Sequence, residues 1–168
     1  MISKEQLKNR FVHACENVIL AEEELTAIDS KFGDADHGLT MHKIAAAIKT
    51  SVCESAGDIK EMLDDAAMAV MGLNGGSAVP LWNSWLDGMQ EGAPEADEID
   101  VAGVKAMFAS AFEALDDMSG AKVGDKTMMD TVIPASEAIA AYEGDSESEL
   151  FSLAAKAAME GAENRRIL

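Results

Sequence analysis

Three carboxylates and one imidazole lie close together in the first quarter of the chain. Asp29, Asp34, Asp36 and His37 fall between two segments with a helical pattern. Asp34 and Asp36 are two residues apart, a spacing that turns side chains to different sides of a helix, so they converge only from an irregular loop. All-oxygen ligands suit hard cations such as Mg²⁺ or Ca²⁺, although the spacing is not that of an EF-hand. The stretch predicts a metal-binding loop, with turn formation and helix capping as the structural alternative.

The residues around these carboxylates favour the same interpretation. Gly33 and Gly38 are expected to give the loop its conformational freedom. Asp29 stands at the end of the first helical pattern, where the helix dipole disfavours a negative charge. A nearby cation therefore explains Asp29 better than helix stability does.

Two further loops contain residues suited to a phosphate ligand. Residues 72–80 are rich in glycine and end at Pro80, which is expected to open a helix whose first N–H groups are available to a phosphate. This loop lacks the lysine and spacing of a Walker A motif, and a plain helix connection is the alternative. The side chain of Trp82, which follows this loop, either packs in the core or borders the adenine of a nucleotide. In the third loop, Thr127 and Asp130 have the spacing of a capping box.

Apolar residues recur at helical spacing along nearly the whole chain and predict about seven amphipathic helices. The first is expected to run from its cap Ser3 to about Asp29, and the second to end near Val52. The others are expected at residues 59–71, from Pro80 to about residue 89, at 101–119, from Thr127 through Pro134, and at 147–163. No strand pattern is found, and residues 90–100 are expected to be a solvated loop. The fold class is therefore all-α, with the helices in one domain over residues 1–168.

Composition narrows the classes of partner. The formal charge is −18 and the 13 basic residues are scattered, which argues against nucleic acid and anionic membranes. A nucleotide would need metal ions to invert the local charge. Cys15 and Cys53 match no zinc or disulfide spacing, and there is no signal peptide or membrane span, so a cytoplasmic location is expected. The 11 methionines are expected to fill helix cores.

Taken together, the three loops resemble the L subunit of bacterial dihydroxyacetone kinase. The same nucleotide-binding domain is fused at the C-terminal end of single-chain dihydroxyacetone kinases. The matching residues are Gly33-Asp-Ala-Asp-His-Gly38, then Gly75-Gly76 with Pro80-Leu81, then Gly124-Asp-Lys-Thr-Met128 with Asp130 and Pro134. They occur in the order of the family, from the first predicted helix to the last.

The resemblance implies a barrel of helices, eight in the family, whose loops at one end hold ATP or ADP with two Mg²⁺ ions. It assigns Asp29, Asp34 and Asp36 as metal ligands, and His37 as the catalytic residue beside the phosphates. It assigns backbone contacts with the phosphates to Gly75, Gly76, Ser77 and Ala78, and the border of the nucleotide to Thr127 and Met128.

The function implied is donation of a phosphoryl group to dihydroxyacetone or a related small ketose held on a separate K subunit. The phosphoryl group comes either from exchangeable ATP or from a tightly held nucleotide recharged by an M-type protein of the phosphotransferase system. The alternative is a non-catalytic, nucleotide- or metal-responsive interaction protein on the same scaffold.

Two departures from the family pattern stand out. Ala78 and Val79 replace a serine and a glycine of the second loop. In addition, the family's C-terminal lid segment and last helix have no counterpart, and Arg165 and Arg166 align with no family motif. A barrel without that helix is expected to expose a seam beside its first or last helix, through which the chain self-associates or binds a partner.

Overall fold

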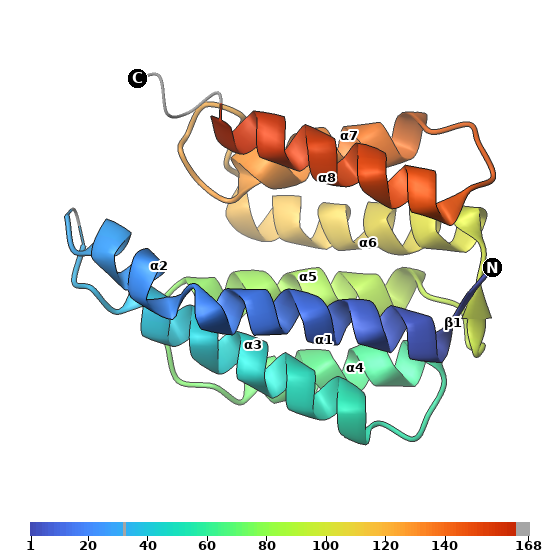
Figure 1. Cartoon of the computed structure of the whole chain (residues 1–168), viewed down its shortest axis with the longest axis horizontal. Helices are drawn as coiled ribbons and strands as arrows, with labels where there is room; N and C mark the ends of the chain where they lie inside the picture. Colours follow the sequence, from blue (N-terminus) through green and yellow to red (C-terminus); the bar gives the residue numbers. More distant parts are fainter. Residues whose placement is uncertain (32, 164–168) are drawn as a thin grey trace.

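The computed structural model describes residues 1–31 and 33–163, and helices make up most of that part of the chain. The helices are α1 (Lys4–Leu20), α2 (Glu22–Asp29), α3 (His37–Glu54), α4 (Ile59–Met71), α5 (Ala78–Gly92), α6 (Val101–Ser119), α7 (Met129–Ala141) and α8 (Glu147–Glu163). From α3 to α8 their direction alternates, so the molecule is an antiparallel bundle (Figure 1). The all-α prediction is confirmed. None of the described helices combines the length and apolar character that crossing a bilayer requires.

Several helices begin at polar caps that the sequence makes available. Ser3 accepts a hydrogen bond from the backbone N–H of Gln6 and forms a capping box with it, as Asp58 does with Glu61. Asp100 Oδ1 accepts a hydrogen bond of 2.7 Å from the N–H of Gly103 at the start of α6. These caps explain why α1, α4 and α6 begin where the apolar periodicity predicts.

The first predicted helix is divided at Ala21, which is a correction to the expected single helix. The N–H of Ala21 is shared between the carbonyls of Asn17 and Val18, each at 3.1 Å, and the chain restarts as α2. Three glutamates, residues 22–24, occupy the first turn of α2, where the helix dipole favours negative charge. The described part of the chain therefore has eight helices, and α2 is free to take its own direction toward the acidic loop.

A short β-clip closes the bundle at the end opposite α2. Ile2 and Ser3 (β1) pair in antiparallel fashion with Ile99 and Glu98 (β2, Glu98–Ile99). Lys4 Nζ donates to the carbonyl of Ser55 at 3.1 Å and also to that of Gly57. The expectations of no strand and of a solvated loop at residues 90–100 were wrong here, because Ile99 is buried and needs a backbone partner.

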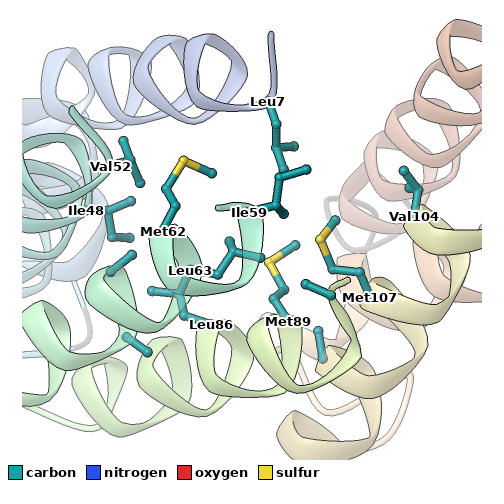
Figure 2. Close-up of a cluster of buried hydrophobic side chains, with 14 of the residues drawn as sticks. Leu7, Ile48, Val52, Ile59, Met62, Leu63, Leu86, Met89, Val104 and Met107 are labelled. Atoms are coloured by element: carbon teal, nitrogen blue, oxygen red, sulfur yellow. The ribbon is translucent and has the colours of Figure 1, made fainter. Parts of the chain in front are cut away.

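The core lies mainly between α1, α3, α4, α5 and α6 (Figure 2), and Ile139 of α7 with Leu150 and Ala154 of α8 extends it. Buried leucine, isoleucine and valine side chains surround the sulfur atoms of Met62, Met89 and Met107. Met129 is also buried, whereas five other methionines are exposed, so the expectation that methionines fill the core holds only in part: the exposed ones are Met1, Met68, Met71, Met118 and Met159.

A small apolar hollow marks the seam between α1 and α8. Its volume is about 230 Å³, and Leu7 and Phe11 of α1 face Phe151 of α8 across it. The Arg10 guanidinium carbon lies 4.7 Å from the centre of the Phe151 ring and so bridges the two helices. Self-association through this seam stays a prediction. Arg165 and Arg166 lie outside the described residues.

Candidate functional site

Three loops share the end of the bundle where α3, α5 and α7 begin (Figure 1). They are the acidic loop, residues 30–36; the glycine loop, residues 72–77; and the third loop, residues 120–128. Alternation of helix direction places them together, since each follows a helix that runs toward this end.

The acidic loop brings Asp29, Asp34 and Asp36 together. Asp29 ends α2, Asp34 lies within the loop, and Asp36 directly precedes α3. Each offers one carboxylate oxygen, and these oxygens lie within 4.8 Å of one another. An octahedral Mg²⁺ shell with ligands at about 2.1 Å has adjacent oxygens about 3.0 Å apart and opposite oxygens about 4.2 Å apart, so side-chain rotations must draw the carboxylates closer before they share one ion. The arrangement fits a hard cation, and its role as a metal site stays a prediction.

The crowding of the three carboxylates raises the pKa of Asp36. Asp34 raises the pKa of Asp36 above its ordinary value, first by a hydrogen bond and then by its negative charge. Asp29 adds to this rise through its charge, while His37 lowers the pKa. A bound cation would remove this repulsion.

The conformation of the acidic loop rests on a residue that the sequence did not indicate. Neither Gly33 nor Gly38 has a positive φ; the left-handed residue is Ala35, at φ 63°. The two glycines permit the loop, as predicted, by leaving space for close contacts and not by a positive φ. Gly33 is needed for space, because its N–H donates to the carbonyl of Asp29 at 2.7 Å and a Cβ there would collide with the Asp29 carboxylate.

Gly38 lets α2 and α3 touch. A Cβ at position 38 would collide with Thr26 Oγ1 and the carbonyl of Glu22, and would lie 2.8 Å from the backbone nitrogen of Thr26. One helical turn further along α3, His42 Nδ1 pairs with Glu22 Oε2. These contacts hold α2, which ends at Asp29, against the helix that follows Asp36.

The glycine loop packs against the first turn of α3. A Cβ at Gly75 would lie 2.7 Å from Val79 Cγ2 and 3.2 Å from Thr40 Cγ2. Val79 is buried in the core, so the valine that departs from the family pattern does not enter the loop. Ser77 precedes α5 and makes no side-chain capping bond. Pro80 is the third residue of α5 and not the first, which its missing N–H permits within the first turn.

The capping box predicted for Thr127 and Asp130 does not form at the end of the third loop. Thr127 Oγ1 accepts from the N–H of Met129 at 3.2 Å, whereas Asp130 Oδ1 accepts from the N–H of Gly124 at 2.9 Å. Asp130 thus reaches back six residues to Gly124, whose φ of 122° is one that glycine adopts readily. The spacing correctly predicted that the Asp130 side chain binds a backbone N–H, but that N–H belongs to Gly124 and not to Thr127.

The acidic loop leads into α3 and the glycine loop packs against the first turn of α3. The third loop shares their end of the bundle without a described contact with the three aspartates. Trp82 and Trp85 are half-buried and pack against the core, with the Trp85 and Phe108 rings 5.8 Å apart in an edge-to-face arrangement. The interpretation of these tryptophans as core residues is therefore favoured.

Thr26 and Thr40, which line the contacts of α3 with α2 and with the glycine loop, were not singled out from the sequence, and no local pattern marks them.

Comparison with known protein families gives a decisive match. Residues 31–167 match the model of the DAK2 domain. The chain belongs to the DAK2 domain family. The match covers the acidic loop from Lys31 on, the glycine loop and the third loop, and it confirms the resemblance seen in the sequence.

Relatives with assigned functions are kinases or kinase subunits. A D-erythrulose kinase of Mycolicibacterium smegmatis is 34% identical over 121 residues, which are 70% of this chain and 21% of the relative. The ADP-binding subunit of a PEP-dependent dihydroxyacetone kinase of Escherichia coli is 26% identical over 140 residues, 82% of this chain and 66% of the relative. A similar subunit of Listeria innocua is 29% identical over 118 residues, 68% of this chain and 55% of the relative. The chain thus spans only part of the length of each of them.

Proposed function

We propose that this chain is a phosphotransferase subunit that binds ADP or ATP with two Mg²⁺ ions at the shared loop end. It donates a phosphoryl group to dihydroxyacetone or a related small ketose held on a separate K subunit. The observation that carries the proposal is the gathering of Asp29, Asp34 and Asp36 within 4.8 Å, beside a glycine loop that packs on α3. The ADP-binding subunits among the relatives support the nucleotide.

The charges make this arrangement coherent. A nucleoside triphosphate carries about four negative charges, which the aspartates alone would repel, so Mg²⁺ ions held by Asp29, Asp34 and Asp36 link the two. When bound, the ions supply electrostatic stabilisation of the transferring phosphoryl group. Residues 75–78 offer backbone N–H groups to the phosphates, and the Ser77 hydroxyl is not used as a helix cap. His37 lies beside the phosphates, and Thr127 with Met128 borders the nucleotide.

Transfer in such a site depends on position more than on covalent chemistry. The chain holds the nucleotide in line with the acceptor hydroxyl of the ketose, and the K subunit supplies the sugar. The phosphoryl source is either exchangeable ATP or a held nucleotide recharged by an M-type phosphotransferase-system protein; some relatives are named PEP-dependent or PTS-dependent. The free thiols Cys15 and Cys53 agree with a reducing cytoplasm.

A coupled assay tests the proposal. The chain is mixed with a K subunit, dihydroxyacetone and Mg²⁺, with either ATP or a phosphoenolpyruvate-driven phosphotransferase system as phosphoryl source. Formation of the sugar phosphate in either arm supports the proposal and identifies the source. Nucleotide binding without transfer in both arms would indicate the non-catalytic interaction protein, and no Mg-nucleotide binding at all would overturn both.

A further inference from the structure

We propose that Asp130 is a positioning residue that holds the third loop in the conformation that binds nucleotide. This inference rests on the proposed function, because that function places Thr127 and Met128 at the border of the nucleotide. The Asp130 side chain lies in the first turn of α7, two residues after Met128.

Burial of the Asp130 carboxylate is the first observation. Asp130 is 3% exposed, and no other carboxylate side chain in the described ranges is buried. Taking a carboxylate out of water is costly unless hydrogen bonds replace the lost hydration. The N–H of Gly124 provides such a bond at 2.9 Å. A buried carboxylate at this position is therefore maintained by the backbone that it binds.

The path of the third loop is the second observation. The bond from Gly124 to Asp130 spans six residues and encloses the segment with Thr127 and Met128. A Cβ at Gly124 would meet nothing within 4 Å, so glycine is required there by its φ of 122° and not by space. Lys126 is also left-handed, at φ 58°. With Gly120 at φ 61°, three residues of this loop have a positive φ. Of these only Lys126 carries a side chain, and its conformation persists because surrounding contacts hold it.

The close packing of α8 against the backbone of Asp130 is the third observation. α8 approaches α7 so closely at Gly161 that a Cβ there would collide with the carbonyl oxygen of Asp130 and lie 2.9 Å from Pro134 Cγ. The position of Asp130 is thus set by helix packing, and its carboxylate transmits that position to the loop. Other side-chain bonds to the backbone of this loop span fewer residues: Lys122 N–H donates to Asp125 Oδ2 at 2.8 Å, Ala121 N–H to Ser119 Oγ at 3.3 Å, and Thr131 Oγ1 to the carbonyl of Met128 at 2.8 Å.

The test compares three variants of the whole chain. Asp130→Ala removes the acceptor, and Asp130→Asn keeps an oxygen that can occupy the position of Oδ1. Asp100→Ala is the matched control, because Asp100 accepts a 2.7 Å bond from the N–H of Gly103 at the opposite end of the bundle. Calorimetry measures Mg-ADP affinity, and hydrogen exchange measures the amide protection of residues 121–128 without nucleotide.

For Asp130→Ala we expect about tenfold weaker Mg-ADP binding, the size of effect typical for loss of a hydrogen bond to a charged group. Exchange of the loop amides should be faster by a similar factor. Asp130→Asn should restore most of both, and Asp100→Ala should lower the melting temperature without changing affinity. If Asp130→Ala does not fold, Gly124→Ala disturbs the same bond from its exposed side and should give the same losses.

The possible failures are distinguishable. A wild-type chain that binds no Mg-ADP overturns the proposed function, while hydrogen exchange still decides whether Asp130 holds the loop. Wild-type affinity and protection in Asp130→Ala would overturn the inference alone. An equal loss of affinity in Asp100→Ala would also overturn it, because the effect would then reflect general destabilisation.

Discussion

The backbone N–H of His37 donates a hydrogen bond to Asp29 Oδ2 at 3.3 Å across eight residues of sequence. The carboxylate at the end of α2 is therefore met by the N-terminus of α3, where the helix dipole favours a negative charge. The dipole of α2 alone would disfavour Asp29, which made a nearby cation the preferred explanation. The N-terminus of α3 thus offsets part of this penalty, and the repulsion within the cluster lies mainly between Asp34 and Asp36.

Removal of one carboxylate should abolish Mg-dependent nucleotide binding. Asp34→Asn and Asp36→Asn each remove one of three candidate ligands, so calorimetric titration with ADP should lose its dependence on Mg²⁺. Circular dichroism should be unchanged, because neither side chain is buried. Asp64→Asn, at an exposed position on α4, is the control and should bind as wild type does. Unchanged affinity in both loop variants would contradict the metal site.

Substitution at Gly38 should separate α2 from α3. In Gly38→Ala the new methyl group collides with Thr26 and Glu22, so we expect destabilisation of about 1–3 kcal/mol. Mg-ADP affinity should fall as well, because Asp29 moves with α2. Gly72→Ala is the control, since its Cβ would lie 3.8 Å from the nearest atoms. Urea denaturation of both variants measures the difference, and equal midpoints would show that the helix crossing relaxes without cost.

Ala35→Gly should stabilise the chain when metal is absent. The left-handed conformation costs alanine about 1–2 kcal/mol, and the greater freedom of glycine in the unfolded chain returns about half of that. A net gain of about 0.5–1 kcal/mol is expected in urea denaturation. Ala27→Gly, on an exposed face of α2, should instead lower the free energy of unfolding by about 1 kcal/mol. A loss in both variants would mean that Ala35 is not held at positive φ.

Much of the fold could be predicted from periodicity and caps, because these signals are local. The bounds at residues 59–71, 101–119 and 147–163 agree with α4, α6 and α8. The break at Ala21 was missed because the apolar stripe continues across it. The pairing of Ile2 with Ile99 was missed because two residues make no visible alternation.

The candidate site was predictable in its residue types and not in its supports. Charge and spacing indicated that the three aspartates converge, whereas the contact of Gly38 with Thr26 depends on how two helices cross. The bond from Gly124 to Asp130 likewise depends on the path of a loop. Contacts of this kind arise from tertiary packing, for which one sequence has no periodic signal.

Mg-ADP should raise the melting temperature of the chain. A ligand at one hundred times its Kd stabilises the folded state by about 2.7 kcal/mol. For a domain of this size that corresponds to about 5–10 °C. Scanning calorimetry with Mg²⁺ alone, ADP alone and both together separates the contributions, and the combination should exceed the sum of the two. A melting curve indifferent to saturating Mg-ADP would favour the non-catalytic alternative.

The two thiols should differ sharply in reactivity. Burial raises the pKa of Cys15 from 9.0 to about 11, while Cys53 is exposed. At pH 8 such a shift lowers the thiolate fraction about 100-fold, so iodoacetamide should modify Cys53 first and Cys15 only after unfolding. Mass spectrometry of the time course measures this. Equal rates in the native protein would contradict the burial of Cys15.

The raised pKa of Cys15 also predicts how the free energy of unfolding depends on pH. Because the folded pKa of Cys15 lies above its unfolded value, the folded state binds more protons between those two values. This contribution to the free energy of unfolding is therefore complete below pH 9.0 and is lost as the pH rises toward about 11. Cys15→Ala should remove that part of the slope in denaturation at several pH values.

Because Ile2 pairs with Ile99, β1 has no partner during synthesis until β2 has been made. During that interval α1 to α5 emerge and have only one another to pack against. The helix that meets α1 through Phe151 and Arg10 is α8, and it is synthesised later still. A nascent chain therefore exposes the part of α1 that Phe151 covers until α8 has been made, and in that interval this part of α1 is open to capture by chaperones.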